Sequence, residues 1–96
     1  MAVLAEYTRT IPEKVERLES LYRSQKWDDY GIEAHGLKNA SRQIGAMELS
    51  AMCAELEKAG KSGNEEMIMQ IHDGMIEKYR AYEPVFKAYL AEKGAS

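Results

Sequence analysis

Apolar side chains recur at helical spacing along most of this chain, and this recurrence restricts the chain to an all-helical fold. Between residues 28 and 44 the recurring set is Tyr30, Ala34, Leu37, Ser41 and Ile44, with steps of 4, 3, 4 and 3. Such spacing places these side chains on one face of an α-helix. Runs of β-branched residues are scarce, and the chain contains only two prolines. The pattern therefore predicts helices without a sheet.

Breaks in the periodicity divide the chain into predicted helices. We expect them at residues 10–25, 28–44, 47–60 and 64–92. Amphipathic helices with short connections favour an antiparallel up-and-down four-helix bundle, which closes its own core and so is expected to be a monomer. A chain of 96 residues fits a single domain over residues 1–96. The short segment before residue 10 is compatible with a domain excised from a longer protein.

Several residues have the chemistry of helix ends. Thr10 with Glu13 three residues later fits a capping box, and Asp28 and Asn64 are the expected caps of two later helices. Pro84 lies inside the last periodic segment, where it is expected to kink or restart the helix.

Composition argues against several classes of protein. The net charge is -3 and no block of like charge occurs, so we expect no nucleic-acid partner. No apolar run approaches the roughly 20 residues of a membrane helix, and the first residues lack the pattern of a secretion signal. The single cysteine, Cys53, rules out an internal disulfide and fits a reducing compartment. We therefore expect a cytoplasmic protein without a membrane partner.

A second stripe lies one residue away from the apolar stripe and contains Gly31, His35, Lys38 and Arg42. Because it borders the buried face, one ring nitrogen of His35 can be held by the protein while the other points to solvent. Lys38 lies three residues further on, within one helical turn. His35 is therefore a candidate for chemistry, although a border histidine without any task fits the same pattern.

Metal binding and hydrolysis fit the sequence poorly. Carboxylate metal sites in helical bundles use Glu-x-x-His pairs, but Ile32 precedes His35 and Met69 precedes His72 at that spacing. One cysteine cannot make a multi-thiolate zinc site. A hydrolytic triad needs a nucleophile and a pocket, and a slim bundle offers little pocket. We expect neither a metal nor a cofactor.

Residues 35–57, HGLKNASRQIGAMELSAMCAELE, resemble the signature of histidine-containing phosphotransfer (HPt) domains of bacterial two-component phosphorelays. The signature has His-x-Leu-Lys-Gly-Ser/Ala-Ser/Ala, then Leu/Ile-Gly-Ala, then Leu, then Leu-Glu. The positions that match without a gap are His35, Leu37, Lys38, Ser41, Ile44, Gly45, Ala46, Leu49, Leu56 and Glu57. The resemblance extends over residues 10–82.

This resemblance implies a phosphocarrier and not a complete enzyme. His35 would accept a phosphoryl group from a receiver-domain aspartate and pass it to another receiver. Lys38 would neutralise the phosphoryl oxygens, and Glu57 would hold the proton on the inner ring nitrogen. The implied partners are response-regulator receiver domains and a hybrid sensor kinase. The expected docking residues are Gly31, Ile32, Gly36, Asn39 and Arg42.

The chain departs from the family pattern at Asn39, where glycine is usual. Asn39 lies four residues after His35 and could narrow the docking surface or donate a hydrogen bond. The alternative function is a helical interaction module that is never phosphorylated.

The remaining notable residues are expected to be structural. We expect His72 at the surface or at the border of the core. The residues expected to fill the core are Cys53, Met52, Met67, Met69, Met75, Tyr79, Tyr82 and Tyr89.

Overall fold

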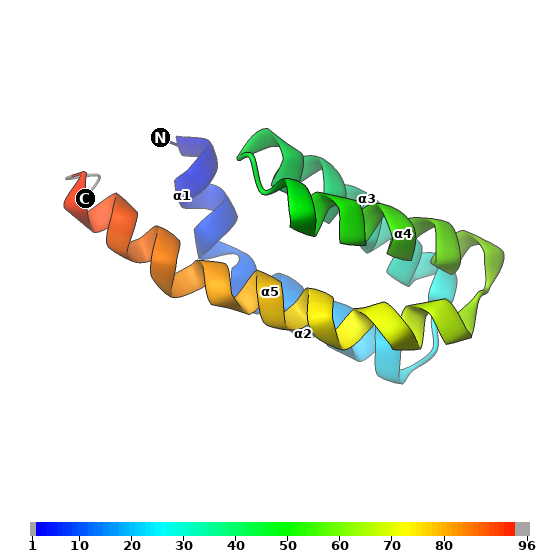
Figure 1. Ribbon diagram of the computed structural model, residues 1–96. Helices are drawn as coiled ribbons and strands as arrows, with labels where there is room; N and C mark the ends of the chain where they lie inside the picture. Colours follow the sequence, from blue (N-terminus) through cyan, green and yellow to red (C-terminus); the bar gives the residue numbers. More distant parts are fainter. Residues whose placement is uncertain (1, 94–96) are drawn as a thin grey trace.

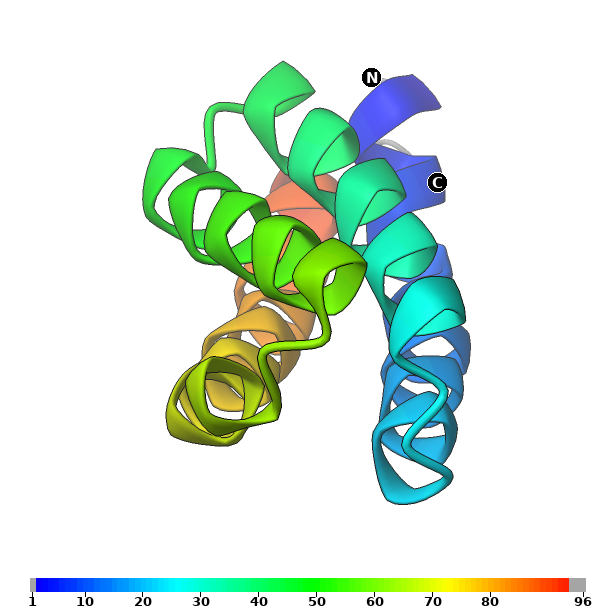
Figure 2. The same ribbon diagram turned by 90° about the vertical axis from the view of Figure 1, so that its right-hand side faces the viewer.

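The computed structural model describes residues 2–93, and every regular element in that range is an α-helix (Figure 1). The helices are α1 (Ala2–Arg9), α2 (Ile11–Arg23), α3 (Trp27–Gln43), α4 (Met47–Ser62) and α5 (Glu65–Glu92). Over the described residues this confirms the all-α prediction. Figure 2 shows α3 and α4 side by side, with α2 and α5 on the other side of the core.

The expected set of helices omitted α1, which the structure adds before residue 10. Leu4 and Tyr7 of α1 are buried in the core. The hydroxyl of Thr10 donates to the carbonyl oxygens of Glu6 and Tyr7, at 3.1 Å each, and makes no capping bond to α2. The capping-box prediction was therefore wrong, because a threonine hydroxyl can bond back to a preceding helical turn instead of capping the next one.

One of the other three helix-end predictions also needs correction, and the restart considered at Pro84 does not occur. Helix α3 starts after Lys26, so Asp28 lies in its first turn and is not the cap. Pro84 lies within α5 and does not restart it. The cap at Asn64 is confirmed, since its side-chain oxygen accepts a hydrogen bond of 3.2 Å from the amide of Met67.

The core runs between the two helix pairs. Its fully buried large apolar side chains are Ile11, Leu18, Tyr30, Leu49, Leu56, Ile68, Met75 and Tyr79. Cys53 is also fully buried, as predicted. Met69, by contrast, is 57% exposed, and Tyr89 is exposed as well, so both were wrongly predicted to be core residues.

His72 was wrongly predicted to lie at the surface or border. It is 0% exposed, and its ring stacks on that of Tyr22 with the centroids 3.8 Å apart. Nε2 lies 2.5 Å from Oε1 of Glu19, and Nδ1 lies 2.6 Å from the hydroxyl of Tyr30. Because a carboxylate only accepts, Nε2 donates to Glu19, and Nδ1 makes the second hydrogen bond of the ring with the hydroxyl of Tyr30. His72 thus joins α2, α3 and α5.

Helices α3 and α4 touch almost backbone to backbone at Gly31 and Gly60. A Cβ atom on Gly60 would lie 2.9 Å from the Cα of Gly31 and 2.8 Å from the carbonyl oxygen of Trp27. A Cβ on Gly31 would also meet the backbone of α4, with Glu57 O at 3.4 Å. Only a residue without a side chain fits at Gly60 in this packing.

We predict that Gly60→Ala destabilises the fold by about 1–3 kcal/mol, because the new methyl group forces the α3 and α4 backbones apart. Gly74→Ala is the matched control, since a Cβ there meets only Met52 Cε at an ordinary 3.5 Å. The control should gain up to about 1 kcal/mol from helix propensity. Urea unfolding of both variants measures the difference, and equal stabilisation of both would contradict the packing argument.

Candidate functional site

His35 stands on the outer border of α3, where its side chain is 53% exposed. The buried residues Ala34 and Leu37 on either side anchor this turn of the helix in the core. Gly31, one turn earlier, holds the same stretch of α3 against α4. The imidazole therefore projects from a fixed helix surface and does not depend on a loop for its position.

The inner nitrogen of His35 is bound to Glu57 of α4. Nδ1 lies 2.9 Å from Oε2 of Glu57, whose side chain is only 10% exposed. An ionised carboxylate accepts hydrogen bonds and cannot donate them. The proton of a neutral His35 ring is therefore held on Nδ1, which leaves a lone pair on the outer nitrogen, Nε2.

Two lysines converge on the same carboxylate. Nζ of Lys38 lies 2.7 Å from Oε1 of Glu57, and Nζ of Lys61 lies 2.9 Å from Oε2. Hydrogen bonds from Lys38 and then Lys61 lower the pKa of Glu57 to about 2, with a smaller contribution from His35. Glu57 is thus ionised at neutral pH, which suits an acceptor for the Nδ1 proton.

The outer nitrogen of His35 also has a neighbour. The amide nitrogen of Asn39 lies 3.2 Å from Nε2. A longer hydrogen bond of 3.4 Å connects a guanidinium nitrogen of Arg42 to the amide oxygen of Asn39. The side chains of Asn39 and Arg42 therefore continue the hydrogen-bonded row that starts at Glu57.

The structure separates the predicted docking residues into two groups. Ile32, Gly36 and Arg42 are exposed around His35, with Ile32 at 64%, and Asn39 is half-buried beside the ring. Gly31 is buried under α4 instead, because this glycine serves helix packing. Its expected place on the exposed surface was therefore wrong.

Lys61 is the site residue that the sequence analysis missed. The signal was present, because Lys61 follows Glu57 by four residues on a helix and such pairs face one another.

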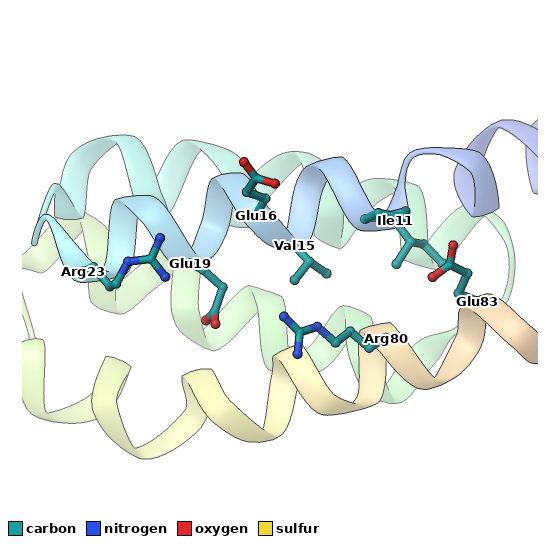
Figure 3. Close-up of a pocket in the computed structure, with 8 residues that line it drawn as sticks. Ile11, Val15, Glu16, Glu19, Arg23, Arg80 and Glu83 are labelled. Carbon is teal, nitrogen blue, oxygen red and sulfur yellow. The ribbon is translucent and has the colours of Figure 1, made fainter.

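The open surface around His35 contrasts with the hollows elsewhere in the molecule. A groove of about 380 Å³ is lined by residues of α2 and α5. Figure 3 shows some of these lining residues, among them Glu19, Arg23 and Arg80. His35 is not among the residues that line this groove.

Within residues 2–93 no group of three or more His, Cys, Asp or Glu side chains could hold a metal ion, and no helix could span a membrane. An exposed imidazole of this kind is accessible to a macromolecular partner.

Comparison with models of protein families gives a match to the model described as "Hpt domain", over residues 2–89. The matched range includes α1 and continues through most of α5. Searches of curated proteins and of solved structures found no match.

The lowered pKa of Glu57 predicts an acid-dependent loss of stability. Its ordinary value is 4.5 and its value in the fold is about 2, so the unfolded chain takes up this proton first as pH falls between those values. The free energy of unfolding therefore decreases over that range. The variant Glu57→Gln has no titratable carboxyl group at this position. We expect its free energy of unfolding to be lower than that of wild type at pH 7, and this difference in free energy to narrow towards pH 2.

Urea unfolding at several pH values measures this dependence. Glu55→Gln is the control, since Glu55 is an exposed carboxylate of the same helix. We expect this control to keep the wild-type pH dependence. A Glu57→Gln curve parallel to wild type over the whole range would contradict the prediction.

Proposed function

The chain belongs to the Hpt domain family, and from this premise we propose that it is a phosphorelay intermediate that carries a phosphoryl group on His35. Hpt domains are phosphocarriers of phosphorelays and interact with receiver domains. In our proposal a receiver-domain aspartate phosphorylates His35, and His35 then phosphorylates a second receiver. A hybrid sensor kinase is a further candidate partner.

The observation that carries this proposal is the polarity of the His35 ring. Glu57 accepts from Nδ1 at 2.9 Å, so in a neutral ring the lone pair belongs to Nε2. In the transfer step Nε2 forms a bond to phosphorus, the P–O bond of the aspartyl phosphate breaks, and the aspartate carboxylate leaves with the electron pair. The ring keeps its Nδ1 proton and becomes a cation, which the negative charge of Glu57 stabilises.

Lys38 is the proposed contact for the phosphoryl oxygens. Its ammonium group lies on the His35 helix and is bound to Glu57 Oε1 at 2.7 Å. A lysine ammonium has three N–H donors, so it can bind a phosphoryl oxygen while it remains near the carboxylate. Phosphoryl transfer depends mainly on alignment and charge stabilisation, and this lysine supplies charge.

The docking surface in this proposal surrounds the exposed ring. Ile32 is an exposed apolar side chain one turn before His35. Gly36 is exposed next to His35 and has no side chain that could obstruct a partner. Arg42 adds a positive charge two turns beyond His35. A receiver domain that docks here would bring the remaining catalytic groups, which is why we assign the chain a carrier role. We further propose that the chain acts as a monomer.

We predict that His35→Gln abolishes phosphorylation by a panel of phosphorylated receiver domains. The wild-type label should be labile in acid and stable in alkali, as expected of phosphohistidine. His72 remains in the variant and serves as an internal control for the assignment to His35. Circular dichroism checks that the variant is folded. Absence of label on a folded wild type, with every receiver tested, would favour an interaction module that is never phosphorylated.

Lys38→Ala should slow phosphoryl transfer by roughly tenfold to a hundredfold, the range expected for loss of one charge-assisted contact. Lys61→Ala is the matched control, because it also removes one cation from Glu57 but lies on α4 with its side chain largely exposed. We expect a smaller effect there in a rapid-quench assay. Equal losses in both variants would mean that Lys38 acts only through Glu57.

A further inference from the structure

Asn39 occupies the position from which a side chain can cover the outer nitrogen of His35. The two residues are four apart on α3, and the amide nitrogen lies 3.2 Å from Nε2. Building on the proposed function, we propose that Asn39 masks the nucleophilic lone pair of His35 in the resting domain and slows acceptance of the phosphoryl group. Asn39 is thus a positioning residue that regulates the rate of this carrier.

The direction of each hydrogen bond in the row is fixed from both ends. A guanidinium group only donates, so Arg42 requires the oxygen of the Asn39 amide and turns the NH₂ group towards His35. At the other end the Glu57 carboxylate only accepts, so the ring proton is on Nδ1. The Asn39 NH₂ group therefore donates to the lone pair of Nε2.

That lone pair is the electron pair that must form the new bond to phosphorus. A nitrogen that accepts a hydrogen bond cannot attack until the donor leaves, so the Asn39 side chain has to rotate away first. The net strength of one neutral hydrogen bond corresponds to about a twofold to tenfold change in an equilibrium or rate. The expected effect of Asn39 is therefore moderate, and it acts on the rate without abolishing transfer.

The contrast with Gly36 locates this effect in one side chain. Gly36 adjoins His35 in sequence, yet a Cβ built there meets nothing within 4 Å. A side chain at residue 36 would thus point into open space, and the proposed mask comes from Asn39, one turn further along the helix. We therefore expect a change at residue 39 to alter the hydrogen bonding of His35 Nε2 and to leave the packing of α3 unchanged.

Three variants separate the hydrogen bond from the bulk of the side chain. Asn39→Ala removes both, whereas Asn39→Leu keeps a similar size and removes only the donor. Gln43→Ala changes an exposed polar residue of the same helix and serves as control. A small phosphoramidate is the phosphoryl donor, because it needs no docking surface. Its P–N bond breaks as the Nε2–P bond forms, and its nitrogen leaves as ammonia.

The first readout is the ¹⁵N resonance of His35 Nε2, recorded in mildly alkaline buffer. We expect it to move to higher frequency in Asn39→Ala and Asn39→Leu, as an unprotonated ring nitrogen does when it loses a hydrogen bond. It should not move in Gln43→Ala. The second readout is the rate of phosphorylation, which we expect to rise about twofold to tenfold in the two Asn39 variants.

Unchanged resonances or rates in Asn39→Ala would overturn the proposal. The proposal would also be overturned if Asn39→Ala were phosphorylated faster than wild type while Asn39→Leu were phosphorylated at the wild-type rate. The size of the side chain alone would then explain the effect. The resonance does not depend on phosphoryl transfer, so it tests the mask even if His35 is never phosphorylated. Failure of the phosphocarrier function would instead appear as absence of label in wild type and in all variants.

Discussion

The close approach of Gly31 and Gly60 is the constraint on which the candidate site depends. A Cβ on Gly60 would lie 2.9 Å from the Cα of Gly31, so α3 and α4 can pack this closely only without side chains at the contact. His35 follows Gly31 by one turn, and Glu57 precedes Gly60 by three residues. The 2.9 Å contact between His35 and Glu57 is thus a consequence of backbone packing one turn away.

The charge distribution of the site follows from that packing. Glu57 is mostly buried, and an unpaired carboxylate in this position would be costly. Its oxygens accept from His35, Lys38 and Lys61, which compensates for the lost hydration and keeps the group ionised. The groups are held on two rigid helices, so the polarity of the imidazole is set before any partner arrives.

Periodicity alone predicted the helical class, and the family resemblance of residues 35–57 implied that Glu57 would contact the inner nitrogen of His35. Periodicity could not predict α1, because eight residues give too few turns for a clear pattern. It misplaced His72 because a histidine scores as polar, although Ile68, His72, Met75 and Tyr79 keep core spacing and are all buried. Gly31 was misread because a glycine at a tight helix contact and a glycine on an open surface look alike in sequence.

The buried cluster around His72 has a consequence for how the helices align along their axes. An apolar contact loses little when two helices slide past one another, whereas Tyr30, His72 and Glu19 satisfy each other only when donors face acceptors. A slip of α5 by one turn would leave the polar atoms of Tyr30 and His72 buried without these partners, whereas Glu19 is partly exposed. The cluster therefore fixes the axial register of α3 relative to α2 and α5. The position of His35 along the long axis of the molecule is thus set by polar contacts inside the core, away from His35 itself.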